Sequence, residues 1–456
     1  MAATFVPAAR PEIELKRQIG LYAAMAITVG NIIGSGIFRS PHSVAQEIHT
    51  VPLVLLAWVI GGVMSLCGSL VLAELAVTNP STGGLYVYIR EAFGNGWAVL
   101  FSWANLWVIK PTVIASITSV FALYLCQVLG LGKGAELPVG MGAILLLTYV
   151  NVLGVKEGAR TQSLFTTLKV IGIIGLCVAA FALPHWGVPA DVAAPAGASA
   201  KPLLLALVVA MIPVLFAYDG WTDSTYVAGE ILEPRRTLPI AIVWGTVLVI
   251  AIYVVTNLAY FHVLAPAEVA AHEAVGAETV RRIAALGDWG GRALAVLVAV
   301  STFGTTNGAV LTGPRVTLAM ASDGLLWRPL AHVNPRSASP DRALWVQGVL
   351  SCLWLALSGG FEDVSGWFVT TSWLFYGLTT AALFVQRRRE GRAGTRLSEY
   401  RTPLWPLPAW VFIIATTGII VSDLTSSGWR AAAGVGMAAL GLPVYWLWKG
   451  RRPSGA

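Results

Sequence analysis

The sequence has few charged residues, 12% of its 456 residues, whereas a soluble domain carries roughly 25%. So few charged side chains cannot coat a water-facing surface, and 56% of the residues are hydrophobic. A soluble globular domain is therefore excluded, whereas a chain surrounded by lipid has no such conflict. The 47 glycines and 18 tryptophans agree with this reading, because membrane helices tolerate Gly and place Trp at the level of the headgroups.

Cysteine and histidine are scarce too, and neither is arranged as a metal site. The cysteines lie in or at the ends of apolar segments, without the spacing of zinc ligands or of a disulfide framework. They are Cys67, Cys126, Cys177 and Cys352. The six histidines are scattered along the chain. We therefore expect small core cysteines, no metal and no cofactor.

The net charge of +7 comes from basic residues in short loops between apolar runs. This distribution does not indicate a nucleic-acid partner. Residues 1–18 are polar and mixed in charge, and the first apolar run is too long for a cleaved signal peptide. We therefore expect no secretory signal.

Apolar runs long enough to cross a bilayer, which takes ~20 residues, are by contrast abundant. They occupy residues 19–48, 51–78, 97–128, 137–154, 161–183, 202–228, 239–264, 290–321, 343–358, 364–386, 404–422 and 429–448. No linker separates them, so we predict one transmembrane domain over residues 1–456, an all-α membrane protein with twelve transmembrane helices. We further predict an external amphipathic helical segment at 265–288 and a cytoplasmic helix at 79–96.

Lys and Arg are distributed unevenly between the loops. If the N-terminus is cytoplasmic, 21 of these residues fall on the cytoplasmic side and 7 on the opposite side, with Lys110 and Lys169 inside the membrane. Because cytoplasmic loops carry the excess of Lys and Arg, we predict a multi-pass protein of the cell membrane with both termini cytoplasmic. This orientation requires an even number of spans, which twelve satisfies.

Glycines interrupt the first apolar run at mid-membrane depth. Gly30, Gly34 and Gly36 fall within seven residues, and Gly34-Ser35-Gly36 are consecutive. Gly costs about 1 kcal/mol relative to Ala inside a helix, so this segment is a candidate for unwinding. Close helix packing through Gly30 and Gly34 explains these glycines equally well when they are taken alone.

A second interruption falls in the sixth run, between Pro213 and Thr222. Pro213 lacks a backbone donor, Gly220 is flexible, and Asp219 is a charge in an apolar segment. A charge at this depth costs at least ~2.5–3.5 kcal/mol and usually faces a cavity. Breaks in runs one and six occupy corresponding positions of two five-helix halves, which indicates an inverted-repeat transporter with its site at the midplane.

The physics of such a site suits an amino acid. A half-helix N-terminus exposes backbone N–H groups and a positive dipole end, which attract a carboxylate. The freed carbonyl groups of the other break accept hydrogen bonds from an ammonium group. Irregular backbone at this depth is stable only where it lines a cavity.

The motifs at the two breaks, Ile-Ile-Gly-Ser-Gly-Ile-Phe at 32–38 and Phe-Ala-Tyr-Asp-Gly-Trp at 216–221, resemble the amino acid–polyamine–organocation superfamily, and within it the L-type amino acid transporters. Further similar motifs are residues 109–111, 301–308, Arg315, 322–324 and 372–373, so that the likeness covers about residues 15 to 390. The resemblance implies a LeuT-type fold, a five-plus-five inverted repeat of core helices at 19–386 with broken helices one and six, and additional helices at 404–448.

By this resemblance the substrate carboxylate would bind to the first break and its ammonium group to both breaks. The carboxylate residues are Ile33, Gly34, Ser35 and Gly36. Ile32 and the carbonyl groups of Phe216 and Ala217 would hold the ammonium group, with Phe216 as an aromatic gate. The side-chain pocket would consist of Val113, Ile117, Phe368, Ser372 and Trp373. Tyr218 and Asp219, within the second break, complete the predicted substrate-binding set.

Lys169, in the middle of the fifth run, resembles a lysine that replaces the cation of a sodium site in sodium-independent relatives, with Ser301 and Thr305 completing that site. A snorkelling lysine and a proton carrier are the alternatives, since burial disfavours a charged ammonium group. For Lys110 we favour a structural role over a cavity-facing one. For Asp219 we favour bonds from the backbone of the unwound turn over direct binding of an ammonium group.

These criteria indicate a secondary transporter of neutral L-amino acids, sodium-independent, that works by alternating access as an exchanger or with proton linkage. A cationic amino acid or polyamine transporter is the alternative within the class. An intramembrane enzyme needs a catalytic constellation at membrane depth, and a channel needs a ring of repeated polar residues; the sequence indicates neither. Eukaryotic relatives carry a cysteine that links a heavy subunit, but residues 129–136 hold none, so we expect no obligatory heavy subunit.

Overall fold

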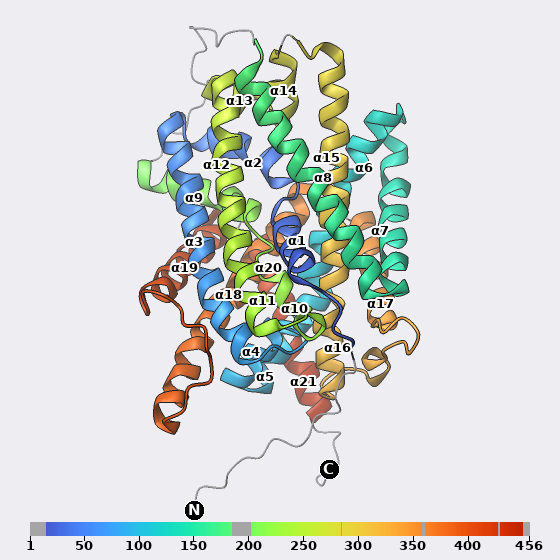
Figure 1. Cartoon of the computed structure of the whole chain (residues 1–456), viewed down its shortest axis with the longest axis vertical. Coiled ribbons are helices and arrows are strands. Elements are labelled where there is room, and N and C mark those ends of the chain that lie inside the picture. The colour runs from blue at the N-terminus through green and yellow to red at the C-terminus, as the bar shows by residue number, and fades with distance from the viewer. Residues whose placement is uncertain (1–14, 185–201, 284, 358–360, 427–428, 450–456) are drawn as a thin grey trace, which may run out of the picture.

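The computed structural model describes residues 15–184, 202–283, 285–357, 361–426 and 429–449, and it is built of helices (Figure 1). Within these residues no strand forms, and a single isolated bridge joins Ile19 to Ile231. Arg10, Lys201, Arg451 and Arg452, which enter the charge count of the predicted orientation, lie outside the described residues. The predicted all-α class is confirmed.

Seven of the described helical segments are long and apolar enough to cross a membrane. These are Leu21–Glu47, Val51–Thr78, Asn95–Leu129, Lys133–Leu153, Val155–Ala182, Pro234–Val263 and Trp289–Ser322. Shorter apolar helices occupy Leu203–Ala217, Leu407–Ser422 and Ala433–Trp446. Each of the twelve predicted runs contains helix, and a multi-pass membrane protein is therefore the reading that the helices support.

The helices follow the predicted runs closely. In the first half they are α1 (Leu21–Ile32), α2 (Gly36–Glu47), α3 (Val51–Thr78), α4 (Leu85–Phe93), α5 (Asn95–Ala104), α6 (Lys110–Leu129), α7 (Glu136–Leu153), α8 (Val155–Ala182), α9 (Leu203–Ala217) and α10 (Asp223–Tyr226). In the second half they are α11 (Pro234–Pro239), α12 (Gly245–Val263), α13 (Pro266–Ala271), α14 (Val275–Arg282), α15 (Gly287–Thr312), α16 (Pro314–Ser322), α17 (Asp341–Leu357), α18 (Phe361–Ala393), α19 (Leu407–Ser426), α20 (Trp429–Ala439) and α21 (Gly441–Lys449).

Both predicted interruptions are present. The first run divides into α1 and α2 at residues 33–35, where the amide of Gly34 donates to the carbonyl of Ile32 at 2.9 Å. The sixth run divides into α9 and α10 around Gly220, whose φ of +113° is a conformation that favours glycine. Pro213 does not break its helix, because α9 continues through it and ends at Ala217.

The broken first helix lies inside the bundle. In Figure 1, α1 is surrounded by α8, α12 and α15, and the three helices all contact it. α2 packs against α9, so the two broken runs also touch each other. Because both breaks are enclosed by other helices, their irregular backbone avoids contact with lipid, as membrane-embedded backbone requires.

The outer surface is apolar where the bundle would meet lipid. On α8, Ile171, Ile174 and Val178 are each more than half exposed, whereas Lys169 on the same helix is fully buried. In a soluble protein, the apolar side chains of a helix would be buried and its charged side chains exposed. The arrangement on α8 is the one expected when hydrocarbon surrounds the bundle and polar groups cluster inside it.

The two predicted loop helices form at opposite ends of the molecule. Residues 265–288 contain the short helices α13 and α14, at the upper end of Figure 1, and residues 79–96 contain α4, at the lower end. Around Glu278 of α14, burial raises the pKa of the carboxyl group, but the bonds from Arg281 and Arg282 outweigh it and hold that pKa below its ordinary value. The carboxylate thus remains charged, and Arg282 also forms an ion pair with Glu268 that joins α14 to α13.

Candidate functional site

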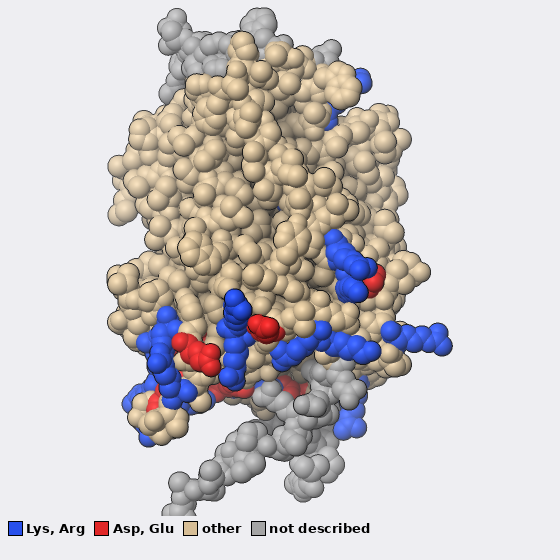
Figure 2. Space-filling view, viewed as in Figure 1, with Lys and Arg blue, Asp and Glu red and all other residues tan. Residues whose placement is uncertain are grey.

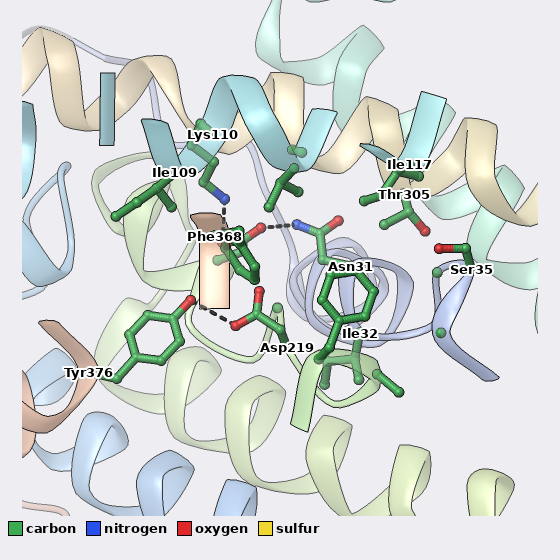
Figure 3. A pocket seen from close by; sticks show the side chains of 18 of the residues that line it. Asn31, Ile32, Ser35, Ile109, Lys110, Ile117, Asp219, Thr305, Phe368 and Tyr376 are labelled. Atoms are coloured by element: carbon green, nitrogen blue, oxygen red, sulfur yellow. Dashed lines mark hydrogen bonds and ion pairs between the residues drawn. The ribbon is translucent and has the colours of Figure 1, made fainter. Parts of the chain in front are cut away.

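A cavity lies between the two breaks and the helices that face them (Figure 3). Its volume is about 40 Å³, which is room for a few water molecules. Ten of the predicted substrate-binding residues line it: Ile32, Gly34, Ser35, Gly36, Val113, Ile117, Phe216, Ala217, Asp219 and Phe368. The predicted site therefore comes together in one place, although its residues come from five separate helices.

At one end of the cavity, the first break offers hydrogen-bond donors. The side chain of Ser35 is 1% exposed, and its hydroxyl has no hydrogen-bond partner among the described residues. Ser35 is also the N-cap residue of α2, directly before its first residue. The first N–H groups of a helix have no acceptor within that helix. The hydroxyl and the positive end of the helix dipole together form a site for an anion.

Beside this end, Lys169 of α8 binds the carbonyl end of α1. Its ammonium nitrogen lies 2.9 Å from the carbonyl oxygen of Gly30, 2.7 Å from that of Ile33 and 2.7 Å from the hydroxyl of Thr305. Ser301 of α15 contributes a weaker contact to Ile33, 3.4 Å from its carbonyl oxygen. The lysine is therefore fully enclosed by neutral oxygen atoms, so it does not snorkel.

Two of the three carbonyl groups expected to hold an ammonium group, those of Ile32 and Ala217, share a hydrogen-bond donor that sequence reasoning missed. The hydroxyl of Tyr253, on α12, lies 2.9 Å from the carbonyl oxygen of Ile32 and 3.0 Å from that of Ala217. The carbonyl oxygen of Ile32 also accepts from the amide of Gly34, so both of its lone pairs have a donor. Tyr253 ties the first break to the second.

The opposite end of the cavity is charged. In Figure 3, Lys110 and Tyr376 lie at the end away from Ser35 and Thr305. Lys110 forms an ion pair with Asp223, 2.7 Å between nitrogen and oxygen, and its ammonium group lies over the ring of Tyr226. Lys110 follows a π-helical turn at Asn105–Ile109, an irregularity that is common at functional sites.

Asp219 lies at this same end. Its carboxylate accepts a hydrogen bond of 2.8 Å from the hydroxyl of Tyr376, on α18 (Figure 3). The backbone of Gly220 also donates to this carboxylate. Asp219 is therefore bound by the backbone of the unwound turn, as we favoured, and in addition by a side chain. The cavity is therefore amphipathic along its length, with an anion site at one end and carboxylates at the other.

Four predicted substrate-binding residues do not line the cavity. The carbonyl group of Ile33 points to Lys169, and Tyr218 packs its ring against Trp58 and Tyr253. Ser372 is fully buried. Trp373 is stacked on Phe412 with ring centroids 5.5 Å apart, so its ring fills the interface of α18 with α19. These four residues pack behind the residues that line the cavity.

The cavity also contains residues that the sequence prediction left out. They are Asn31, Ile109, Gly220, Asp223, Tyr226, Ala309 and Tyr376, together with Lys110, for which we favoured a structural role. Asp223 carried a usable signal, because it is a second charge four residues after Asp219 within an apolar run. The two tyrosines carried none, since a lone tyrosine in a membrane helix has no distinctive spacing.

The glycines of the breaks serve different purposes. A Cβ atom at Gly36 would lie 2.6 Å from the Cα atom of Ala217, and one at Gly220 would lie 2.7 Å from the backbone carbon of Asn31. At Gly34, by contrast, the nearest atom is in the side chain of Thr305 at 3.4 Å. Gly36 and Gly220 therefore let the two breaks touch, whereas a Cβ atom at Gly34 would make only an ordinary van der Waals contact with Thr305.

Among the described residues, no group of three or more His, Cys, Asp or Glu side chains could hold a metal ion. The four cysteines are free, and Cys126 is buried. The polar groups of the cavity are therefore amides, hydroxyls, two carboxylates and one ammonium group, with none of the spacing that a nucleophile and its base require.

A helical bundle of the membrane with two broken helices around a buried polar cavity is the architecture of a carrier of small molecules. The profile of the family described as amino acid permease matches residues 19–446. The chain belongs to this family of membrane transporters, which confirms the resemblance seen in the motifs.

Individual proteins with similar sequences agree. The chain is 31% identical over 444 residues to the serine/threonine exchanger SteT of Bacillus subtilis, covering 96% of this chain and 98% of that protein. It is 33% identical over 379 residues to the b(0,+)-type amino acid transporter 1 of Oryctolagus cuniculus, covering 82% and 76%. It is 31% identical over 448 residues to the large neutral amino acids transporter small subunit 2 of Mus musculus, covering 95% and 81%.

Proposed function

We propose that the chain is a sodium-independent exchanger of neutral L-amino acids that works by alternating access. The observation that carries the proposal is the position of Lys169 between the carbonyl groups of Gly30 and Ile33. The carbonyl end of a helix is a negative dipole end that attracts a cation. Because the ammonium group is covalently attached, no dissolved sodium ion is needed at this place.

In this proposal, the substrate carboxylate binds the hydroxyl of Ser35 and the backbone N–H group of Gly36, at the start of α2. The unsatisfied, buried hydroxyl of Ser35 supports this pose, because a buried donor without a partner is costly and is usually explained by a ligand. The ammonium group lies against the carbonyl groups of Ile32, Phe216 and Ala217, two of which Tyr253 already aligns.

The middle of the cavity supports a preference for neutral side chains. Phe216 lies edge-to-face with Phe368, with ring centroids 6.2 Å apart, and Val113 and Ile117 add apolar lining. In its position beside Ala217, Phe216 can close over a bound amino acid, which fits the proposed gate. The names of two relatives, a serine/threonine exchanger and a large neutral amino acids transporter, point to neutral substrates as well.

The architecture proposed with this function is a LeuT-type inverted repeat with twelve membrane helices. The positions of the two breaks, in the first and sixth apolar runs, support it. For the orientation, Figure 2 presents most Lys and Arg side chains of this face near the end that holds α4 and α5. That end would be cytoplasmic by the distribution of positive charge.

We further propose that the chain transports without a heavy subunit, although the name of one relative describes a small subunit. The support is the absence of cysteine from residues 129–136 and the burial of Cys126, which is 2% exposed. A thiol that is enclosed by its own chain is not accessible for a disulfide to a partner. Purified chain alone should therefore be active.

The test is counterflow into proteoliposomes that contain only the purified chain, with a panel of labelled amino acids. We expect exchange of neutral L-amino acids that is the same in sodium, potassium and choline buffers. Several-fold stimulation by sodium would contradict the role of Lys169. Competition by arginine, putrescine or agmatine where alanine and leucine have no effect would contradict the neutral substrate class.

A matched pair of variants tests the placement of the cavity. Phe216→Ala should slow exchange because the ring that closes the cavity is lost. Trp373→Ala should leave the order of preferred substrates unchanged, because its ring packs on Phe412 rather than in the cavity. A changed substrate order in Trp373→Ala would instead place this side chain in the pocket, as the resemblance implied.

A further inference from the structure

A chain of buried amide side chains leads away from the charged end of the cavity. The amide nitrogen of Asn31 donates to Asp223 at 2.5 Å, and Gln162 donates to the oxygen of Asn31 at 3.1 Å. Asn307 donates to the oxygen of Gln162 at 3.1 Å, and Asn151 donates to the oxygen of Asn307 at 3.0 Å. We name Asn151, Asn307, Gln162 and Asn31 the amide chain.

The hydrogen bonds between the members of the amide chain, and from Asn31 to Asp223, all run in one direction, toward Asp223. An ionised carboxylate only accepts hydrogen bonds, so it requires the NH₂ group of Asn31 to face it. The oxygen of Asn31 must then face Gln162, and the same condition passes to each following amide. The Lys110 ion pair keeps Asp223 in the acceptor-only form. The charge of one carboxylate therefore orders four amides.

The sequence leaves room for the amide chain by placing glycines against it. A Cβ atom at Gly308 would lie 1.6 Å from the side-chain oxygen of Asn31, and one at Gly158 would lie 2.1 Å from that of Asn151. A Cβ atom at Gly30 would lie 2.4 Å from the amide nitrogen of Gln162. Three of the four amides thus occupy space that any other residue would fill.

The amide chain connects parts of the molecule that are far apart in sequence. Asn31 and Asp223 belong to the two broken runs, whereas Gln162, Asn307 and Asn151 belong to the continuous helices α8, α15 and α7. Gln162, Asn307 and Asn151 are fully buried, and Asn31 is 6% exposed. In such an environment aligned hydrogen bonds polarise and strengthen one another. The amide chain is therefore a stiff link between both breaks and the surrounding helices.

We propose that the amide chain positions the two broken helices during the switch of access, with Gln162 as its central positioning residue. Alternating access requires the breaks to move relative to continuous helices, and the amide chain is a polar connection between them. Of the four amides, only Asn31 lines the cavity, where it contacts Asp223. Loss of the amide chain should therefore change the maximal rate of exchange more than the affinity for substrate. The inference rests on the proposed exchange activity.

Gln162→Glu tests this proposal, because the carboxylate keeps the shape of the amide but cannot donate to Asn31. In proteoliposomes with labelled L-serine, or with the neutral amino acid that the wild type exchanges fastest, we expect a maximal rate about tenfold lower at about pH 9. An alkaline pH is needed because burial disfavours the ionised form of a glutamate. The half-saturation concentration should change by less than about threefold. As the pH falls toward about 5, the ratio of variant to wild-type rate should rise, because a protonated glutamic acid donates again.

The matched control is Gln347→Glu, which is the same substitution at a buried glutamine of α17 outside the amide chain. It should not give this combination of a lower rate and recovery in acid. A second variant, Gly308→Ala, displaces Asn31 by steric contact and should lower the maximal rate at every pH.

Three outcomes would overturn the proposal: wild-type rates in Gln162→Glu or Gly308→Ala, a loss in Gln162→Glu that persists in acid, or equal behaviour of Gln347→Glu. If the wild type itself exchanges no amino acid of the panel, the proposed function fails instead. The two failures are therefore distinguishable in a single series of measurements.

Discussion

Each of the two helix breaks is held by a buried lysine from another helix, but the two lysines have different partners. Lys169 contacts the first break through neutral oxygen atoms, those of Gly30, Ile33 and Thr305. Lys110 contacts the second break through the carboxylate of Asp223. The first arrangement joins a cation to the end of a helix dipole, and the second is an ion pair.

This difference determines which changes each break can tolerate. A backbone carbonyl group cannot be removed by mutation, so the first break always presents acceptors that need a cation. An ion pair can be removed as a unit, and replacement of a buried pair by uncharged residues of similar volume is often neutral. Loss of Lys169 should therefore always impair the first break. The second break should be impaired when only one charge of its ion pair is removed, and much less when both are removed.

The largest effect is expected for Lys169→Ala, which should reduce exchange by at least about a hundredfold. The variant loses charged hydrogen bonds that contribute about 1.5–3 kcal/mol each, and each tenfold corresponds to about 1.4 kcal/mol. Counterflow in proteoliposomes measures the loss. Lys156→Ala, at an exposed position of the same helix, is the control and should retain exchange. An unchanged maximal rate in Lys169→Ala would remove the distinction between the two lysines.

The next effect tests the ion pair at the second break. Asp223→Asn leaves the ammonium group of Lys110 buried without its carboxylate, and breaking such a pair costs about 3–5 kcal/mol. The double variant Lys110→Met with Asp223→Asn removes both charges and should recover much of this stability. Thermal unfolding of the purified proteins measures both. Equal losses in the single and double variants would show that the charges are not coupled.

A smaller effect is expected where the two breaks touch. Gly36→Ala inserts a methyl group against the backbone of Ala217, and overpacking of this kind costs about 1–3 kcal/mol. Gly34→Ala meets only the side chain of Thr305, so its unfolding should stay within about 0.5 kcal/mol of the wild type, while substrate affinity decreases. Similar stabilities of the two variants would contradict the close contact at Gly36.

The smallest effect is expected for a partly exposed pair at the first residue of α17, before the predicted run 343–358, that of His332 with Asp341. Partial burial raises the pKa of the Asp341 carboxyl group, but the bonds from His332 and from the amide of Arg342 outweigh it and lower that pKa. A lowered pKa adds stability above the ordinary value, near 4, which is lost as the pH falls through the folded value. Asp341→Asn should cost about 1 kcal/mol or less at pH 7 and nothing in strong acid. A loss comparable with that of Asp223→Asn would remove the contrast between buried and exposed pairs.

Several features of the site could be predicted from the sequence because each is local. Gly34-Ser35-Gly36 and Asp219-Gly220 are unfavourable inside a lipid-embedded helix, so their presence indicated two breaks and a cavity. Lys169 stood out for the same reason, as a charge deep in an apolar run. The structure brings the lysine to the first break and ten of the predicted residues to one cavity.

Sequence reasoning failed where a partner lies far along the chain. Trp373 belongs to a matching motif, yet its neighbour is Phe412 rather than the cavity. The position of a motif along a helix does not specify which face of that helix another helix will cover. Pro213 was expected to contribute to the second break, but the tertiary packing of α9 keeps that helix intact as far as Ala217.

The sequence alone determined that the chain lies in a membrane, that it is helical, and that its first and sixth runs are interrupted, because composition and local backbone preference act within a few residues. Only the tertiary structure decided which polar groups meet. Lys110 and Asp223 are 113 residues apart, and Gln162 and Asn31 are 131 residues apart. Their pairing follows from the packing of separate helices, since a buried polar group is stable only where the fold supplies its partner.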